Sequence, residues 1–102
     1  MTAVPKPTPA LDPLIHEAAR LAIVAVLAEC DAADFNFVLA TTGLTRGNLS
    51  AHMAKLVAAG YVLETKQFMD RKPHTDYRLT PAGRNAFKRY RQAWRRLTGG
   101  AS

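Results

Sequence analysis

Polar side chains suited to contacting a nucleic acid occur close together between residues 44 and 60. They combine a guanidinium, an amide, a hydroxyl and an ammonium group, with a threonine ahead of them: Thr45, Arg46, Asn48, Ser50 and Lys55. In the major groove of DNA, arginine can form two parallel hydrogen bonds to guanine, asparagine can do so to adenine, and serine can contact a base or a phosphate. The spacing therefore predicts that this group enters the major groove, with Arg46 and Asn48 contacting base edges.

The same segment has the pattern of an amphipathic helix that ends at a glycine. Leu49, Met53 and Leu56 recur at i, i+4 and i+7 and form one narrow apolar stripe, which is typical of a helix docked on a small core. The opposite face carries the small residues Gly47, Ala51, Ala54 and Ala58. Small residues let the helix backbone approach a large partner closely, and the major groove, about 12 Å wide, admits a helix. Thr45 is predicted to cap this helix, and Asn48 stands where a capping box would place Glu or Gln, which leaves it free to face DNA.

A hairpin with a basic tip is predicted after this helix. Tyr61–Lys66 and Thr75–Thr80 are rich in strand formers and alternate in polarity, so both are expected to be strands. The intervening residues 67–74 are expected to be a loop whose tip carries Arg71 and Lys72. These two cations would reach the adjacent minor groove or its phosphates, because a narrow minor groove has a strongly negative potential.

The order helix, turn, helix and hairpin resembles the winged helix-turn-helix DNA-binding domains, close to the MarR and ArsR types of bacterial and archaeal regulators. The match extends over about residues 35 to 97 and is carried by Gly43-Leu44-Thr45, Gly47-Asn48-Leu49-Ser50, His52, Lys55-Leu56, Ala59-Gly60-Tyr61-Val62 and Leu79-Thr80-Pro81-Ala82-Gly83. The fold that the resemblance implies is mainly α with a small β-hairpin wing. It also implies dimerisation through the terminal helices, which suits two half-sites one helical turn apart.

Two further helices are expected before the DNA-contacting helix. The first begins at Asp12-Pro13, where aspartate is a good cap and proline suits the first helical position, and it extends to Cys30. It is either one long helix or a short one interrupted near His16-Glu17. After a turn over residues 31–36, with a short edge strand near Phe35, a second helix ends at Gly43. Its apolar residues are Phe37, Leu39, Ala40 and Leu44.

The last helix begins at Thr80-Pro81 and is expected to continue to about Leu97. Its large apolar residues recur in a heptad-like seam made of Phe87, Tyr90, Trp94 and Leu97. The aromatic rings exceed what a compact monomer of this size covers easily, so the first and last helices of two chains are expected to form a homodimer. Leu14 completes the predicted dimer interface. The alternative is that the seam packs on the first helix of its own chain.

Length and charge fit one small domain that binds a polyanion. The chain has 102 residues, and we assign residues 1–10 to a disordered N-terminal arm and residues 11–98 to a single domain. Up to residue 36, two basic and five acidic residues give a net charge of −3, whereas twelve basic and three acidic residues in the remainder give +9. Such a basic surface suits a nucleic acid. Without an apolar run of about 18 residues or a signal peptide, the chain is predicted to be soluble and cytoplasmic, with no membrane partner.

The sequence contains no constellation of catalytic or metal-binding residues. His16, His52 and His74 lie on three different predicted elements, and no carboxylate pair has a catalytic spacing. Cys30 is the one cysteine, which excludes an internal disulfide and any multi-cysteine zinc site. No cofactor and no metal are therefore predicted. His52 is interpreted as a packing or phosphate-contacting residue, and Cys30 as a small core residue rather than a sensor of oxidants.

These patterns together predict a sequence-specific regulator of transcription that binds double-stranded DNA as a homodimer and acts as a repressor. The alternative is a winged helix that serves as a protein–protein interaction module, which would not need a basic wing tip or a small-residue face. An enzyme is disfavoured because the sequence lacks site chemistry. The operator, the regulated genes and any small-molecule effector are not identified by the sequence.

Overall fold

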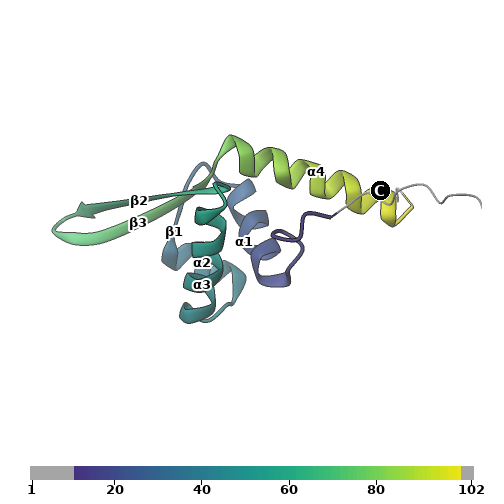
Figure 1. Ribbon diagram of the computed structural model, residues 1–102. Helices are drawn as coiled ribbons and strands as arrows, with labels where there is room; N and C mark the ends of the chain where they lie inside the picture. The colour runs from purple at the N-terminus through teal and green to yellow at the C-terminus, as the bar shows by residue number, and fades with distance from the viewer. Residues whose placement is uncertain (1–10, 100–102) are drawn as a thin grey trace, which may run out of the picture.

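The computed structural model of the chain describes residues 11–99, which form four helices and a three-stranded sheet (Figure 1). In chain order the elements are α1 (Ala18–Ala28), β1 (Ala33–Asp34), α2 (Phe35–Thr42), α3 (Arg46–Ala58), β2 (Val62–Met69), β3 (Lys72–Leu79) and α4 (Pro81–Leu97). The strands form one antiparallel sheet in the order β1-β3-β2. The disordered arm predicted for residues 1–10 lies outside the described residues.

Residues 11–17 form an irregular turn, so the predicted helix start at Asp12-Pro13 is wrong. Within the turn, the His16 backbone N–H donates to the Asp12 carbonyl at 2.7 Å. Glu17 has an extended backbone and caps α1, because its carboxylate accepts hydrogen bonds at 3.1 and 3.0 Å from two backbone N–H groups of the first helical turn. The alternative of one long helix is therefore wrong, and the chain does break near His16-Glu17, but the residues before the break form a turn and not a short helix.

The ends of α2 follow local signals, and its one buried residue is Val38, which is not among the predicted apolar residues. Asp34 caps the helix by accepting a hydrogen bond from the Phe37 backbone N–H at 2.7 Å, and Gly43 ends it with a φ of 72°. A short edge strand precedes α2, and this strand pairs with β3. Val38 is the buried residue of α2, whereas Phe37 is 50% exposed. The apolar residues predicted for this helix do not include Val38, whereas Leu39 and Leu44 pack against the core as partly buried residues.

The hairpin is longer than the sequence predicts. β2 and β3 pair without interruption out to Met69 and Lys72, so much of the predicted loop over residues 67–74 is strand. The turn consists of Asp70 and Arg71, with φ values of 51° and 68°, and this type I′ geometry matches the natural twist of a hairpin. Pro73 is tolerated within β3 because β1 covers only the other end of that strand, which leaves Pro73 with a neighbouring strand on one side only.

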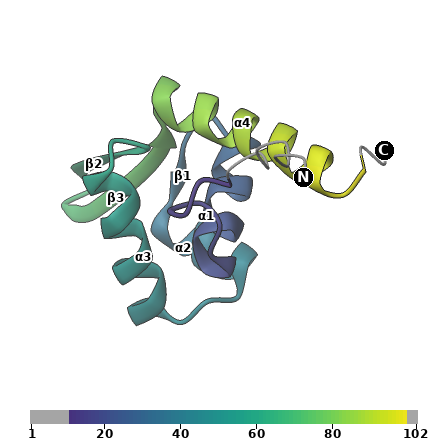
Figure 2. The same cartoon turned by 45° about the vertical axis from the view of Figure 1, so that its right-hand side comes forward.

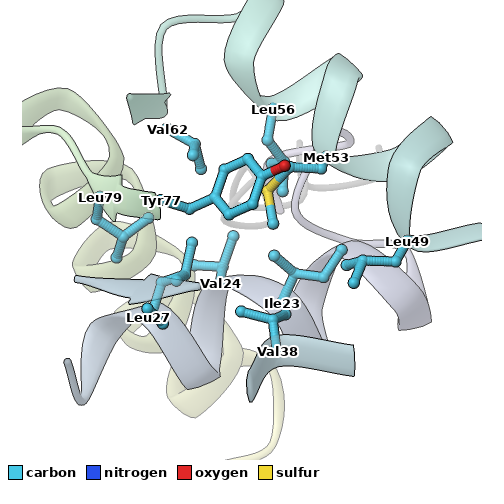
Figure 3. Close-up of a cluster of buried hydrophobic side chains, with 11 residues drawn as sticks. Ile23, Val24, Leu27, Val38, Leu49, Met53, Leu56, Val62, Tyr77 and Leu79 are labelled. Atoms are coloured by element: carbon cyan, nitrogen blue, oxygen red, sulfur yellow. The ribbon is translucent and has the colours of Figure 1, made fainter. Parts of the chain in front are cut away.

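The main core lies between α1, α2, α3 and the base of the sheet (Figure 3). The side chains labelled there are Ile23, Val24, Leu27, Val38, Leu49, Met53, Leu56, Val62, Tyr77 and Leu79. The stripe predicted along α3 is confirmed, because Leu49 and Leu56 have no exposed surface and Met53 is 2% exposed. Burying a side chain of this size contributes about 1.5–3 kcal/mol, so the inner face of α3 fixes the helix to the body.

α4 crosses one end of the body and extends past it (Figures 1 and 2). Thr80 caps it by accepting a hydrogen bond from the Gly83 backbone N–H at 3.0 Å, as predicted. Gly83 permits the close crossing, because a Cβ atom at this residue would overlap the Tyr61 carbonyl. A second apolar cluster joins α4 to the N-terminal turn and comprises Ile15, Ala86 and Tyr90.

Candidate nucleic-acid interface

The exposed face of α3 is the first part of the candidate interface (Figure 2). The polar residues that the sequence singles out on this helix and its cap are all exposed, namely Thr45, Arg46, Asn48, Ser50 and Lys55. The Thr45 hydroxyl accepts a hydrogen bond from the Asn48 backbone N–H at 3.2 Å, which confirms the predicted cap. The small residues Gly47, Ala51, Ala54 and Ala58 are exposed too. They lie opposite the buried stripe and form the centre of the face, with hydrogen-bonding groups at its margins.

Arg46 is turned toward α2 rather than away from the body. Its Nη2 donates to Asn36 Oδ1 at 3.3 Å, and the guanidinium lies 5.7 Å from the centre of the Phe35 ring. Contacts of this kind at an exposed site stabilise weakly, so Arg46 rests at the edge of the interface without being buried. Sequence reasoning missed Asn36, because an asparagine in the first turn of a helix carries no functional signal by itself.

His52 lies where α3 meets α1. Its Nδ1 is 3.1 Å from Arg20 Nη1 and 3.5 Å from Glu17 Oε2. The backbone N–H groups that cap onto the Glu17 carboxylate lower its pKa, and the nearby His52 and Arg20 lower it further. Arg20 also donates from Nε to the Leu14 carbonyl at 2.5 Å. His52 thus has polar partners within its own chain, which favours a packing role for it.

The wing is the second part of the candidate interface. Arg71 occupies the turn and Lys72 begins β3, and both are exposed. Lys66 on β2 is exposed as well, with its Nζ 3.7 Å from Glu64 Oε1. At the base of the wing, burial and the neighbouring Glu64 raise the pKa of Tyr77 to about 12, so its hydroxyl stays protonated at neutral pH. The wing therefore joins a cationic tip to a base that is buried in the main core.

The aromatic seam of α4 is divided between the chain's own core and its surface. Tyr90 is 6% exposed and its hydroxyl lies 2.8 Å from a ring nitrogen in the N-terminal turn, while Leu14 packs against the main core. Phe87 is partly buried. By contrast, Trp94 is 48% exposed and Leu97 is 41% exposed. The alternative in which the seam packs within its own chain therefore holds for the first half of the seam, whereas the second half is exposed.

α4 is also strongly basic. It has no acidic residue, and its six cations are Arg84, Lys88, Arg89, Arg91, Arg95 and Arg96. Arg84 donates to the carbonyls of Ala28 and Cys30, at 3.4 and 3.1 Å, where α1 ends and its last carbonyls lack helical partners. In both views the C-terminal half of α4 points away from α3 and the wing (Figures 1 and 2). Its cations therefore add positive potential without extending the surface formed by α3 and the wing.

Within the described part of the chain, no three His, Cys, Asp or Glu side chains are placed to hold a metal ion. The histidines have separate surroundings: His16 contacts α4, His52 contacts α1, and His74 Nε2 is 2.8 Å from Asp76 Oδ1. Cys30 is partly buried against the main core. Over residues 11–99, none of the helices is both long enough and apolar enough to cross a membrane.

Comparisons with known proteins agree with this architecture. A family model described as a winged helix DNA-binding domain matches residues 19–98. An uncharacterized protein of Methanocaldococcus jannaschii is 32% identical over 77 residues, which span 76% of this chain and 84% of that protein. The structure of a transcriptional regulator homologue from Pyrococcus horikoshii OT3 gives a TM-score of 0.80 at 29% identity, over 85% of this chain and 86% of that one. A MarR variant from E. coli complexed with operator DNA gives a TM-score of 0.68 at 18% identity, over 88% of this chain and 70% of that chain, and this likeness is one of fold.

Proposed function

The chain belongs to the winged helix DNA-binding domain family, and from this premise we propose that it regulates transcription by binding specific sites in double-stranded DNA as a homodimer. The observation that carries the proposal is the exposed face of α3, which has small residues at its centre and hydrogen-bonding side chains at its margins. A surface helix that faced only water would normally carry long charged side chains at that centre. Such side chains would hold a duplex away from the helix backbone.

In the proposed complex, α3 enters the major groove. The groove is about 12 Å wide, and the small residues at the centre of the face let the helix backbone approach its floor. Asn48 then contacts adenine through two hydrogen bonds, while Ser50 and Lys55 contact a base or a phosphate from the two margins. Thr45 lies at the helix N-terminus, where a phosphate is favoured by the helix dipole and the free backbone N–H groups. Each good bidentate pair discriminates against a wrong base by about 1–3 kcal/mol.

Arg46 and the wing supply the remaining contacts. For Arg46 to bind guanine, it must exchange its contacts with Asn36 and the Phe35 ring for contacts with DNA. Both of these contacts are weak, so two hydrogen bonds from the guanidinium to a base can replace them. Arg71 and Lys72 reach phosphates or the minor groove beside the α3 site. In this arrangement α3 carries most of the specificity, and the wing contributes mainly affinity.

The uncovered end of α4 is the proposed dimer contact. Trp94 and Leu97 are exposed, apolar and nearly one turn apart on a helix that extends past the body. Trp94 borders a groove of about 370 Å³ that is open to a second α4 and is lined by Leu21, Phe87, Tyr90, Arg91, Trp94 and Arg95. Phe87 and Tyr90 line this groove from their own chain, whereas Leu14 packs against the main core. A twofold dimer would present two α3 helices to two half-sites.

Occupancy of DNA is the proposed mode of regulation. A dimer bound across a promoter excludes other proteins from that stretch of DNA, and we therefore infer that the chain acts as a repressor. The inferred role is binding rather than catalysis, and the inferred location is the cytoplasm, where such a regulator meets DNA. A small-molecule effector is not needed for this mechanism.

Selection from random duplex DNA tests the proposal. The protein should enrich a twofold-symmetric sequence with two half-sites about one helical turn apart. Ala54→Glu places a carboxylate in the centre of the α3 face and should abolish binding while the thermal unfolding midpoint stays close to that of the parent. Ala54→Ser is the matched control and should bind. If the parent binds no duplex even at low salt, the alternative of a protein–protein interaction module is favoured.

A further inference from the structure

The distal hairpin has two unlike faces. Opposed residues of an antiparallel pair point to the same side, and alternate residues along one strand share a side. The strand register therefore defines an inner face, which includes Val62 and Tyr77 near the core and continues outward through Lys66, Phe68, Pro73 and Thr75. It also defines an outer face, which consists, from Asp76 outward, of Thr65, Gln67, Met69, Lys72, His74 and Asp76.

Side-chain contacts agree with this division. On the outer face, the Asp76 carboxylate lies 2.8 Å from His74 and 3.4 Å from Gln67, so these polar groups are partners of one another. On the inner face, Glu64 and Lys66 are 3.7 Å apart. Between Lys66 and the turn, the inner face has apolar residues only. The polar side chains in the middle of the outer face are therefore partners of one another, whereas the tip of the inner face consists of an apolar ring and a proline.

The inner face is turned to the side of the hairpin on which α3 lies. At the base of the hairpin, Val62 and Tyr77 pack in the main core with Met53 and Leu56 of α3 (Figure 3). The hairpin then projects well beyond the core while α3 stays on one side of it (Figure 1). A duplex seated on the exposed face of α3 would consequently lie beside the inner face of the distal hairpin.

Phe68 is an exposed apolar ring at the tip of the inner face. A wing that bound DNA by charge alone would have no role for such a ring. Phe68 is 77% exposed, more than any other large apolar residue between 11 and 99, and it pairs across the hairpin with Pro73. Lys66, Arg71 and Lys72 surround it along the chain. Proteins that bind the minor groove combine cations on phosphates with apolar wedges such as phenylalanine, which partly unstack a base step. The charge and shape of this tip match that combination.

We propose that Phe68 is an apolar wedge that enters the minor groove beside the α3 site and partly unstacks one base step, an inference that rests on the proposed DNA-binding function. Lys66 on the same face and Arg71 in the turn hold the phosphates on either side of the ring. Pyrimidine–purine steps are the most easily unstacked. Phe68 therefore makes the complex selective for such a step at a fixed distance from the bases that α3 contacts, without any hydrogen bond from the wing to a base.

The test compares variants of the full chain on a selected duplex that carries 2-aminopurine at the flanking step. Phe68→Ala should bind about tenfold more weakly, keep the salt dependence of the parent, and lose the fluorescence increase that reports unstacking. Phe68→Leu keeps an apolar wedge and should retain part of both signals. Met69→Ala is the matched control, because Met69 is 53% exposed on the outer face, and it should behave as the parent does. Unchanged thermal unfolding should show that all variants fold.

A variant with both Arg71→Ala and Lys72→Ala gives the contrasting behaviour. Its salt dependence should be flatter by about 0.9 for each phosphate that the wing no longer neutralises. If Phe68→Ala binds and unstacks DNA as the parent does while this double variant loses affinity, the proposal that Phe68 is a wedge is wrong. DNA binding by the wing would still hold in that case. If Phe68→Ala changes only the sedimentation of the free protein, the ring is a protein contact and the wedge is again overturned. A parent that binds no duplex overturns the proposed function itself.

Discussion

α3 and α4 are both amphipathic helices with a threonine cap, but they distribute side-chain size in opposite ways. α3 buries leucine and methionine and exposes glycine and alanine. α4 buries mainly small residues, with Tyr90 as the exception, and exposes Trp94 and Leu97. The two helices therefore have inverted surfaces on one small domain.

This inversion indicates how close each helix comes to its neighbours. Small residues on the outside of α3 allow a partner to approach the helix backbone, which suits the floor of a DNA groove. Small residues on the inside of α4 allow that helix to lie directly on the body, as Gly83 does over the Tyr61 carbonyl. Its large side chains Trp94 and Leu97 are then left on the surface, where the proposed second chain would pack. Side-chain size and burial together thus distinguish the proposed DNA-binding helix α3 from the proposed dimer helix α4. An apolar pattern alone would not distinguish them.

The largest effect is expected from truncating the inner face of α3. Leu49→Ala removes a fully buried side chain and should lower the free energy of unfolding by about 2–5 kcal/mol. Ala51→Ser, on the exposed face of the same helix, should change it by no more than about 0.5 kcal/mol. Urea denaturation of both variants measures the difference. Equal losses would show that the two faces of α3 are not as unlike as described.

The second effect concerns the outer face of α4. Trp94→Asp puts a charge into the proposed dimer contact and should weaken dimerisation by about 2 kcal/mol or more, roughly thirtyfold, while the monomer stays folded. Gln92→Asp adds the same charge on a different side of α4 and is the control. Analytical ultracentrifugation and titration of a two-half-site operator measure both consequences. If the parent is monomeric at micromolar concentration, the proposed dimer contact is wrong and the seam belongs to the monomer alone.

A third effect tests base discrimination on the outer face of α3. Asn48→Ala should lose about 1–3 kcal/mol of discrimination between the selected site and a site with one base pair changed. Folding should be little affected, because the Thr45 cap bonds to the backbone N–H of residue 48 and not to its side chain. Asn85→Ala removes an equivalent exposed amide from α4 and should leave discrimination intact. Retained specificity in Asn48→Ala would mean that another residue contacts this base.

The smallest effect concerns Glu17, which caps α1 and lies beside His52 of α3. Because the pKa of Glu17 is lowered in the folded chain, its carboxylate stabilises the fold above the usual value of 4.5, and this contribution disappears as the pH falls through the lowered pKa. Glu17→Gln should therefore be less stable than the parent at neutral pH, and the gap should close in acid. Thermal melts between neutral and acidic pH measure this gap. Glu29→Gln removes the same charge at the other end of α1, where the helix dipole does not favour a carboxylate, and should not destabilise the chain at neutral pH.

Much of the helix-turn-helix could be predicted because its signals are local. The hydroxyls of Thr45 and Thr80 bond to backbone N–H groups three residues ahead, and Gly43 ends α2 with a left-handed backbone. The buried stripe of α3 also follows from spacing, since residues three and four apart share one side of any helix. Each of these features depends on atoms within about one helical turn, so it is the same whatever surrounds it.

The ends of the two wing strands and the start of α1 could not be predicted from local signals in the same way. The turn of the hairpin contains Asp70 and Arg71, and arginine is an unusual residue for a positive φ, so the sequence carried only a weak signal for a two-residue turn. Cross-strand pairing out to Met69 and Lys72 supplied what local propensity lacked. At the other end of the chain, Glu17 provides a cap that the Asp12-Pro13 signal obscured.

By itself, the sequence determined the caps of α3 and α4, the end of α2 at Gly43, the inner face of α3, the order of the elements and the excess of positive charge in the C-terminal part of the chain. Only the tertiary structure decided that Val38 rather than Phe37 enters the core, that Arg46 rests against α2, and that Tyr90 is covered while Trp94 is not. The physical reason is the range of the interactions. A cap or a helical period is completed by neighbours in the chain, whereas burial depends on which distant segments fold onto the same place, and the N-terminal turn covers only the first half of α4.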